Sequence, residues 1–370
     1  MQPYSPQKLP ISGIDWESLA NPIGRANRAV GNFGGILRGL PNPEVLLSPL
    51  VTQEAVLSSR IEGTIATLSE VLRFEAGEES FSPEKQNDIY EIVNYRVAML
   101  TAEKLLRTKP FHLNLLLKLH SILLDSVRGR DKGRGRFRTI QNWIGRPNTS
   151  VEQATFVPPS PSVLPEYLDN WEKYYHADRP DPLVQLSIIH AQFEILHPFL
   201  DGNGRLGRML IPLFLYEKKI LFSPVFYISE FLEKNREEYV TSLQSISVDS
   251  DWNQWIMFFL ESIAAQAGTN ALKAKQILEL YNRLKSHFLE QTHSQYAIPL
   301  LDFMFRAPVF STTQVLEQPH MPTRATVFQI LRKLVHDGSL KIVRAGSGRR
   351  PQVFALPELI NLCEGRKVFV

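Results

Sequence analysis

Apolar residues recur every three or four positions in several stretches of the chain, which is the spacing of an amphipathic helix. Between residues 182 and 196 they include Leu186, Ile189, Phe193 and Leu196. Pro198 cannot continue a helix, and it disfavours helical angles at the residue before it. The pattern therefore predicts a helix that ends near residue 197 and a loop that follows it.

A second helix is predicted over residues 206–216, directly after Gly202, Asn203 and Gly204. These three residues favour left-handed backbone angles and let main-chain N–H groups approach an anion closely. The first turn of a helix binds phosphate, because its N–H groups are free and its dipole favours negative charge. Arg205 and Arg208 are three apart, so we expect both guanidinium groups on one side of that turn.

Two titratable residues flank this phosphate-binding pattern. His197 has an ordinary pKa near ~6.5, so it can accept a proton at neutral pH. Asp201 would repel phosphates unless a cation such as Mg²⁺ lay between them. Each residue alone is more often structural than functional. Their combination within twelve residues predicts a site that holds a nucleoside triphosphate and deprotonates an attacking group.

Residues 197–208 resemble the signature of the Fic (Fido) family, His-x-Phe-x-(Asp/Glu)-Gly-Asn-Gly-Arg-x-x-Arg, with every fixed position filled. Members of this family mostly transfer AMP from ATP to a Tyr, Thr or Ser hydroxyl of another protein. The resemblance implies a nucleotidyltransferase of the protein adenylyltransferase kind. ATP would be its substrate, Mg²⁺ its cofactor, and a target protein presenting a hydroxyl side chain its partner.

The resemblance also assigns roles within the signature. His197 would be the general base, Phe199 would anchor the loop, and Asp201 would bind Mg²⁺ between the α- and β-phosphates. The nucleotide-binding residues would be Gly202, Asn203, Gly204, Arg205, Leu206, Gly207 and Arg208, with Arg205 on the β-phosphate and Arg208 on the γ-phosphate.

An upstream segment bears on regulation. Ser48 is a candidate N-cap for a helix with Pro49 in its first turn, and Gly63 is a stop signal. Ser58 and Glu62 are four apart and share one face. The pattern Ser-x-x-x-Glu-Gly is similar to the inhibitory motif of the Fic family, which implies that Glu62 pairs with Arg208 in place of the γ-phosphate. Surface helices often carry such a pair without any such role.

Two β-prone pieces, Gln141 to Ile144 and Thr155 to Val157, flank a polar turn from Pro147 to Ser150. They predict a β-hairpin with a long loop, which resembles the flap that holds a target segment in the Fic family. The preceding basic cluster is either a solvated loop that supports the flap, which we favour, or a nucleic-acid contact. Its members are Arg128, Arg130, Lys132, Arg134, Arg136 and Arg138.

The segment 226–239 also resembles the family, where it helps to form the nucleoside pocket. Asn235 and Tyr239 are four apart and are expected to reach the adenosine together. A plain amphipathic helix is the alternative interpretation.

Near the C-terminus the pattern predicts helices around 310–316 and 322–338, then strands at 340–343 and 352–356. This order resembles a winged helix. It would serve either DNA binding or contacts with proteins, including a second copy in a homodimer. The residues that would contact DNA are Arg324, Thr326, Arg332, Arg349 and Arg350.

Composition sets the remaining limits. The chain has 370 residues, a formal net charge of +3 and one cysteine, Cys363. It therefore lacks an internal disulfide and a global nucleic-acid field. No apolar run approaches the ~18 residues of a membrane span, and the start of the chain lacks a secretory signal. We expect a cytoplasmic protein that makes no membrane contact.

We predict a mainly α fold, with a Fic-type helical core, a β-hairpin flap and a C-terminal winged helix. The expected parts are an N-terminal helical region (1–110), the catalytic core (111–265), a connecting helix (266–291) and the winged helix (292–370). The competing function is a DNA-binding regulator with a nucleotide-sensing Fic core. An intact His197 favours the enzyme, because a sensor needs no base.

Overall fold

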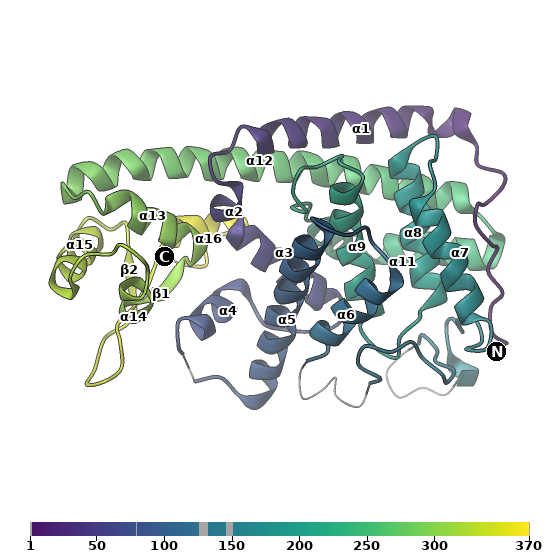
Figure 1. Ribbon diagram of the computed structural model, residues 1–370, viewed down its shortest axis with the longest axis horizontal. Helices are drawn as coiled ribbons and strands as arrows, with labels where there is room; N and C mark the ends of the chain where they lie inside the picture. Colours follow the sequence, from purple (N-terminus) through teal and green to yellow (C-terminus); the bar gives the residue numbers. More distant parts are fainter. Residues whose placement is uncertain (1, 79, 126–131, 146–150, 370) are drawn as a thin grey trace. The chain divides into compact units, whose positions relative to one another are not determined.

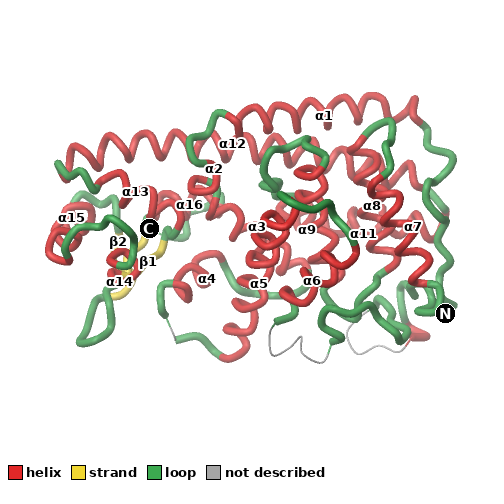
Figure 2. Tube along the Cα trace, viewed as in Figure 1, coloured by secondary structure: helices red, strands yellow, loops and turns green. Residues whose placement is uncertain are grey.

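The computed structural model describes residues 2–78, 80–125, 132–145 and 151–369. Helices dominate, and within these residues strands are confined to the C-terminal part (Figure 2). The predicted mainly α class is confirmed. Contacts divide the chain into two compact units. The first comprises Met1–Gly34, Leu57–Gly63 and Asn94–Gly268, and the second comprises Gly35–Val56, Thr64–Val93 and Thr269–Val370.

Several long helices run from one unit into the other. They are α1 (Trp16–Arg38), α3 (Ser48–Ile61), α5 (Pro83–Leu106) and α12 (Trp252–Thr292). The predicted connecting helix at 266–291 is thus only the second part of α12, which begins at Trp252. Its apolar residues Ile277, Leu280 and Leu284 are buried, whereas Leu272 is 57% exposed.

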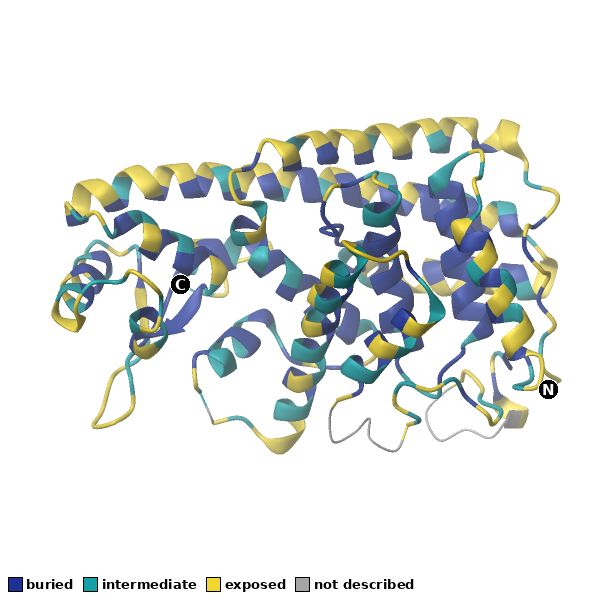
Figure 3. Ribbon diagram, viewed as in Figure 1, coloured by how far each residue is buried: buried dark blue, intermediate teal, exposed yellow. Residues whose placement is uncertain are grey.

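Helix α8 (Pro182–Leu196) forms the centre of the first unit. Its N-cap is Asp181, whose carboxylate accepts hydrogen bonds from the N–H groups of Leu183 and Val184, both at 2.9 Å. Pro182 fits the first turn, where no N–H donor is needed. The helix is buried along almost its whole length (Figure 3), because its apolar residues are spread around the helix and are not confined to one face. It ends where Pro198 predicts, at His197.

Helices α7 and α9 pack on either side of α8 (Figure 1). The indole N–H of Trp171 on α7 donates to the Ile189 carbonyl of α8 at 2.9 Å. The other elements of this unit are α6 (Leu113–Leu123), η2 (Val151–Gln153), α7 (Leu164–His176), α9 (Asn203–Glu217), α10 (Ser229–Lys234) and α11 (Arg236–Asp249).

The second unit contains a three-stranded antiparallel sheet of order β1-β3-β2. Its elements are α2 (Pro43–Leu46), α4 (Leu68–Glu75), α13 (Ala297–Arg306), β1 (Val309–Ser311), α14 (Thr312–Leu316), α15 (Arg324–His336), β2 (Lys341–Arg344), β3 (Val353–Ala355) and α16 (Pro357–Glu364). The two predicted helices and two predicted strands of the C-terminal part are all present, in the order expected of a winged helix.

Strand β1 was not expected from the sequence. It has three residues and passes directly into α14, whose capping box joins Ser311 and Gln314. A capping box marks a helix start, and that signal hides so short a strand. Ser48 is the first residue of α3 and not its expected N-cap, because the carbonyl of Leu47 already accepts from the Val51 N–H at 3.2 Å.

Among the described residues, no helix is long and apolar enough to cross a membrane.

We predict that Asp181→Ala lowers the free energy of unfolding by about 1–2 kcal/mol, because α8 loses its N-cap. Urea denaturation measures the change. Asp178→Ala is the control, because Asp178 is exposed and caps no helix, and it should leave stability nearly unchanged. Equal effects of the two substitutions would contradict the assigned role of Asp181.

Candidate active site

The loop between α8 and α9 forms the floor of the site. His197 ends α8 with left-handed angles (φ 43°), and Gly202 precedes α9 with left-handed angles as well (φ 79°). Helix α9 begins at Asn203, three residues earlier than predicted. Asn203 and Gly204 are therefore helical, and of the three residues that allow left-handed angles only Gly202 adopts them.

The imidazole of His197 is held in one tautomer. Its Nδ1 lies 3.3 Å from the backbone carbonyl of Glu194. A carbonyl only accepts hydrogen bonds, so Nδ1 carries the proton and the lone pair of Nε2 is left for a substrate. Burial lowers the pKa of His197 to about 4, against the opposing effect of that carbonyl. The ring is thus neutral at pH 7, with a nitrogen lone pair that can accept a proton.

Phe199 and Asn203 fix the shape of the loop. The Asn203 side chain accepts from the Phe199 N–H and donates to the Phe199 carbonyl, both at 2.9 Å. The buried ring of Phe199 stacks on His120 at 3.8 Å between centroids. Asn203 therefore clamps the loop through its side chain, and the expected anion contact of its main-chain N–H group stays a prediction. Phe199 anchors the loop, as the resemblance implied.

Two residues that support the loop were missed by sequence reasoning. Arg138 is buried and donates to the backbone carbonyls of His197 (2.9 Å) and Leu196 (3.3 Å). Its charge thereby faces the negative end of the α8 dipole. His120 accepts from the Gly135 N–H at 2.8 Å and donates to the Asp201 carbonyl at 3.1 Å.

The interpretation of the basic cluster as a solvated loop is wrong for Arg138. No local signal separates this residue from its basic neighbours. Within the cluster, Arg134 pairs with Asp125 at 2.7 Å, while Arg128 and Arg130 lie outside the described residues.

Arg205 and Arg208 point to different partners, although we expected them on one side. Arg205 is buried and donates to Asp201 Oδ1 at 3.2 Å. The Asp201 side chain is 42% exposed. In the described part of the chain no group of three or more His, Cys, Asp or Glu residues could hold a metal. A single carboxylate fits Mg²⁺ only if substrate phosphates and water supply the other ligands.

Arg208 is bound by the end of α3. Its Nε donates to Ser58 Oγ at 2.9 Å, and its Nη2 donates to the Ser58 carbonyl at 2.8 Å and to Glu62 Oε1 at 2.7 Å. The guanidinium is 1% exposed, whereas the Glu62 side chain is 40% exposed. Loss of hydration alone would raise the pKa of Glu62, but Arg208 holds it below its ordinary value. Glu62 is therefore an anion at neutral pH.

A cavity of about 210 Å³ brings these groups together. Its polar lining includes Glu62, His197, Gly204 and Arg208, and its apolar lining comes from several elements of the first unit. The apolar residues are Ile61, Ile144, Phe156, Ile195, Val240 and Leu243. A cavity with a buried guanidinium, a neutral imidazole and an apolar wall suits a ligand with phosphates at one end and a ring at the other.

Two family models match the chain: "Fic/DOC family N-terminal" over residues 20–104 and "Fic/DOC family" over residues 110–215. Together they cover just over half of its length. The chain belongs to the Fic family.

Curated relatives of this Fic protein carry names that state an activity. A "probable protein adenylyltransferase" of Aquifex aeolicus is 36% identical over 92 residues, which are 25% of this chain and 26% of the relative. "Protein adenylyltransferase fic-1" of Caenorhabditis elegans is 33% identical over 131 residues, which are 35% of this chain and 22% of the relative. The chain thus spans about a quarter of the length of these relatives.

A crystal structure of a Fic family protein from Desulfovibrio desulfuricans has the same fold, with a TM-score of 0.58 and 19% identity. The match covers 96% of this chain and 98% of that one. The shared fold therefore includes both units of the chain.

The Fic flap is smaller than the predicted hairpin. Ile144 and Phe156 form a single antiparallel bridge, with N–H to carbonyl distances of 2.8 and 3.2 Å, and η2 precedes Phe156. The two predicted strands are therefore wrong. The predicted turn, Pro147 to Ser150, lies outside the described residues.

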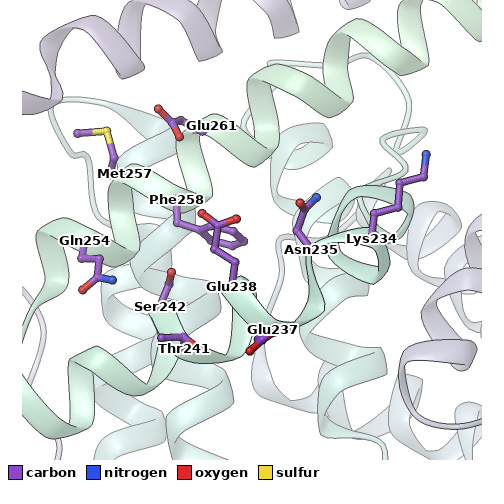
Figure 4. A pocket seen from close by; sticks show the side chains of 10 residues that line it. All are labelled: Lys234, Asn235, Glu237, Glu238, Thr241, Ser242, Gln254, Met257, Phe258 and Glu261. Atoms are coloured by element: carbon purple, nitrogen blue, oxygen red, sulfur yellow. The ribbon is translucent and has the colours of Figure 1, made fainter.

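Asn235 and Tyr239 line different pockets. Tyr239 lines the cavity with His197, and its hydroxyl lies 3.0 Å from His190 Nε2. Asn235 lines a pocket between α10, α11 and α12 (Figure 4), and its amide donates to the Phe231 carbonyl at 2.9 Å. This arrangement does not favour the expected joint contact with adenosine, which stays a prediction.

Leu206 and Gly207 have packing roles in the structure, and their nucleotide contacts stay a prediction. The Leu206 side chain is buried in the core. The carbonyl of Gly207 accepts from His190 Nδ1 at 3.0 Å. A Cβ atom at Gly207 would overlap Glu194 Oε1, so the glycine makes room for that carboxyl group.

The residues predicted to contact DNA lie in the second unit. Arg324, Arg332, Arg349 and Arg350 are exposed, and the Thr326 hydroxyl lies 3.1 Å from that of Thr323. Their exposure is compatible with phosphate contacts and equally with protein contacts. DNA binding and homodimer formation stay predictions.

We predict that Gly207→Ala leaves stability unchanged or lowers it by up to about 1 kcal/mol, because the added methyl group displaces the buried Glu194 carboxyl group. Alanine would otherwise favour a helix over glycine by about 1 kcal/mol. Thermal unfolding measures the effect. The control is Gly31→Ala on α1, where a Cβ meets nothing within 4 Å, and it should stabilise. A stabilising Gly207→Ala would show that the Glu194 carboxyl lies elsewhere.

Proposed function

We propose that this Fic protein is a protein adenylyltransferase, which transfers AMP from ATP to a Tyr, Thr or Ser hydroxyl of a target protein. The observation that carries this proposal is a neutral His197 with a free Nε2, in the same cavity as the buried cation Arg208. A nucleotide-sensing DNA regulator would need the cation and would have no use for the base. The names of the curated relatives point the same way.

The triphosphate would be bound from three directions. The first turn of α9 offers free N–H groups and the positive end of its dipole. Arg208 is the cation for the terminal phosphate, and Arg205 lies beside Asp201 for the β-phosphate. Asp201 would hold Mg²⁺ together with the phosphates. When bound, that ion would neutralise charge on the phosphate oxygens.

Transfer would begin at the target hydroxyl. Nε2 of His197 takes the hydroxyl proton while the oxygen attacks the α-phosphorus. A new oxygen–phosphorus bond forms, the bond from the α-phosphorus to the bridging oxygen breaks, and pyrophosphate leaves with that electron pair. The Glu194 carbonyl on Nδ1 stabilises the imidazolium that results. Arg138 keeps the loop, and with it the ring, in place.

The contact between Glu62 and Arg208 would keep the enzyme inactive. The carboxylate occupies the guanidinium that the terminal phosphate needs, so ATP would bind with its α-phosphorus misaligned for attack. Ser58 strengthens this arrangement, because both its hydroxyl and its carbonyl accept from Arg208. Removal of Glu62 would therefore release activity.

We predict that Glu62→Gly raises self-labelling with radiolabelled ATP and Mg²⁺ roughly 10- to 100-fold, the range expected for loss of a competing charged hydrogen bond. Adding His197→Ala to Glu62→Gly should abolish the labelling, because the base is lost. Incorporation of label and mass spectrometry of the modified residue are the measurements.

Glu237→Gly is the matched control for this test, because Glu237 is exposed and lines the other pocket. It should label like the wild type. If Glu62→Gly labels no more than the wild type while His197→Ala abolishes labelling, the enzyme assignment stands and the inhibitory one is wrong. If no variant incorporates AMP from ATP, the proposed activity fails.

A further inference from the structure

A second carboxyl group shares the cavity with Glu62, and the proposed mechanism does not use it. Glu194 lies on the last turn of α8, three residues before His197, and lines the same cavity as Arg208. The residue is 8% exposed. Its Oε1 atom has no hydrogen-bond partner among the residues that the structure describes. A buried carboxyl oxygen without a partner is costly, so it calls for an explanation.

Helix α9 leaves space for this carboxyl group at Gly207. Gly207 stands inside the helix, where glycine costs about 1 kcal/mol relative to alanine. Any larger residue there would overlap Glu194 Oε1. Two unfavourable features, a mid-helix glycine and an unpartnered buried oxygen, thus coincide at one point beside Arg208. Such coincidences are typical of functional sites.

Glu194 faces one buried cation and one further carboxylate, which are Arg208 of α9 and Glu62 directly after α3. Tyr239 of α11, His197 and the exposed Arg236 line the same cavity. Glu62 hydrogen-bonds to Arg208 and therefore neutralises it. Two carboxylates beside one buried guanidinium repel each other, so one of them keeps a proton.

The pKa values of the two carboxyl groups move in opposite directions. Burial and the charge of Glu62 raise the pKa of Glu194 to about 7, although Arg208 opposes the change. The pKa of Glu62 is lowered instead. Glu62 is therefore the ionised member of the pair, and Glu194 is the member that exchanges a proton near neutral pH.

We propose that Glu194 is the alternative counter-ion of Arg208: it keeps a proton while Glu62 or a triphosphate holds the guanidinium, and releases that proton when the guanidinium is left alone. This inference rests on the proposed function, because it assumes that ATP is the ligand that replaces Glu62. It makes Glu194 a positioning residue for Arg208 and couples nucleotide binding to pH.

The consequence concerns enzyme released from inhibition. Without Glu62, the attraction of Arg208 lowers the pKa of Glu194, so the carboxyl group is ionised at pH 8. A triphosphate that takes Arg208 restores the repulsion, and Glu194 must take up a proton again. ATP affinity therefore falls as pH rises through the pKa of the released state, by up to tenfold per pH unit. Replacing Glu194 by a neutral residue removes this dependence.

Isothermal titration calorimetry tests the proposal. ATP and Mg²⁺ are titrated into Glu62→Gly and Glu62→Gly/Glu194→Gln at pH 6, 7 and 8, in buffers of different ionisation enthalpy. At pH 7 we expect Glu62→Gly to take up about half a proton more per bound ATP than the Gln variant. Its dissociation constant should rise about tenfold or more from pH 6 to pH 8, relative to that variant. Protonation of ATP itself cancels in the comparison.

Glu62→Gly/Glu238→Gln is the control, because Glu238 is an exposed carboxylate of the other pocket, and it should behave like Glu62→Gly. Glu194→Met, which also removes the charge, should reproduce the flat profile and serves if the Gln variant does not fold. Equal proton uptake by variants with and without Glu194 overturns the inference. Loss of ATP binding on Glu194→Gln also overturns it, because an ionised carboxylate would then be required. If Glu62→Gly itself binds no ATP, the proposed function has failed instead.

Discussion

The buried charge of Arg208 is the constraint on which the site depends. The guanidinium is 1% exposed, and a buried cation without an anion is strongly unfavourable. In the structure the anion is Glu62, and two further hydrogen bonds come from Ser58. Any ligand of the cavity must therefore displace Glu62 or bind without this cation. The same constraint makes Glu194 important, because Glu62 and Glu194 are not both ionised beside this one cation.

Around this charge, most of the side-chain contacts hold the backbone of the loop, and the position of the reactive group depends on that backbone. The carbonyls at the end of α8 are held by Arg138, and the loop after them is held by Asn203 and by the contact of His120 with Phe199. His197 follows from these constraints, because its Nδ1 has only a carbonyl to bind. The proposed base thus gains its tautomer from the scaffold, and it needs no acidic partner of its own. The family signature is largely a set of backbone supports, with few residues free to touch a ligand.

The sequence predicted the elements that local rules determine. Pro198 and Gly63 mark the ends of α8 and α3, and the apolar spacing marked α8 itself. It also brought Glu62, Arg208 and His197 into one hypothesis, which the positions of these residues in one cavity support.

Burial that depends on contacts between distant parts of the chain could not be predicted from local sequence patterns. Arg138 looked like its solvated neighbours, and Glu194 looked like one more polar residue of a buried helix. Asn235 differs from the expectation for a local reason, because it is the N-cap of α11 and has non-helical angles (φ −114°, ψ 36°). Its side chain therefore lines another pocket than Tyr239, although the two residues are four apart.

The central claim is that Glu62 and the terminal phosphate of ATP compete for Arg208. The most direct test compares the affinities of ATP and ADP for the wild type and for Glu62→Gly at pH 6, by calorimetry with Mg²⁺ present. ADP lacks the phosphate that would reach Arg208, so the account predicts that Glu62→Gly tightens ATP binding by about tenfold or more and leaves ADP binding nearly unchanged. An equal gain for both nucleotides, or no gain for ATP, would contradict it.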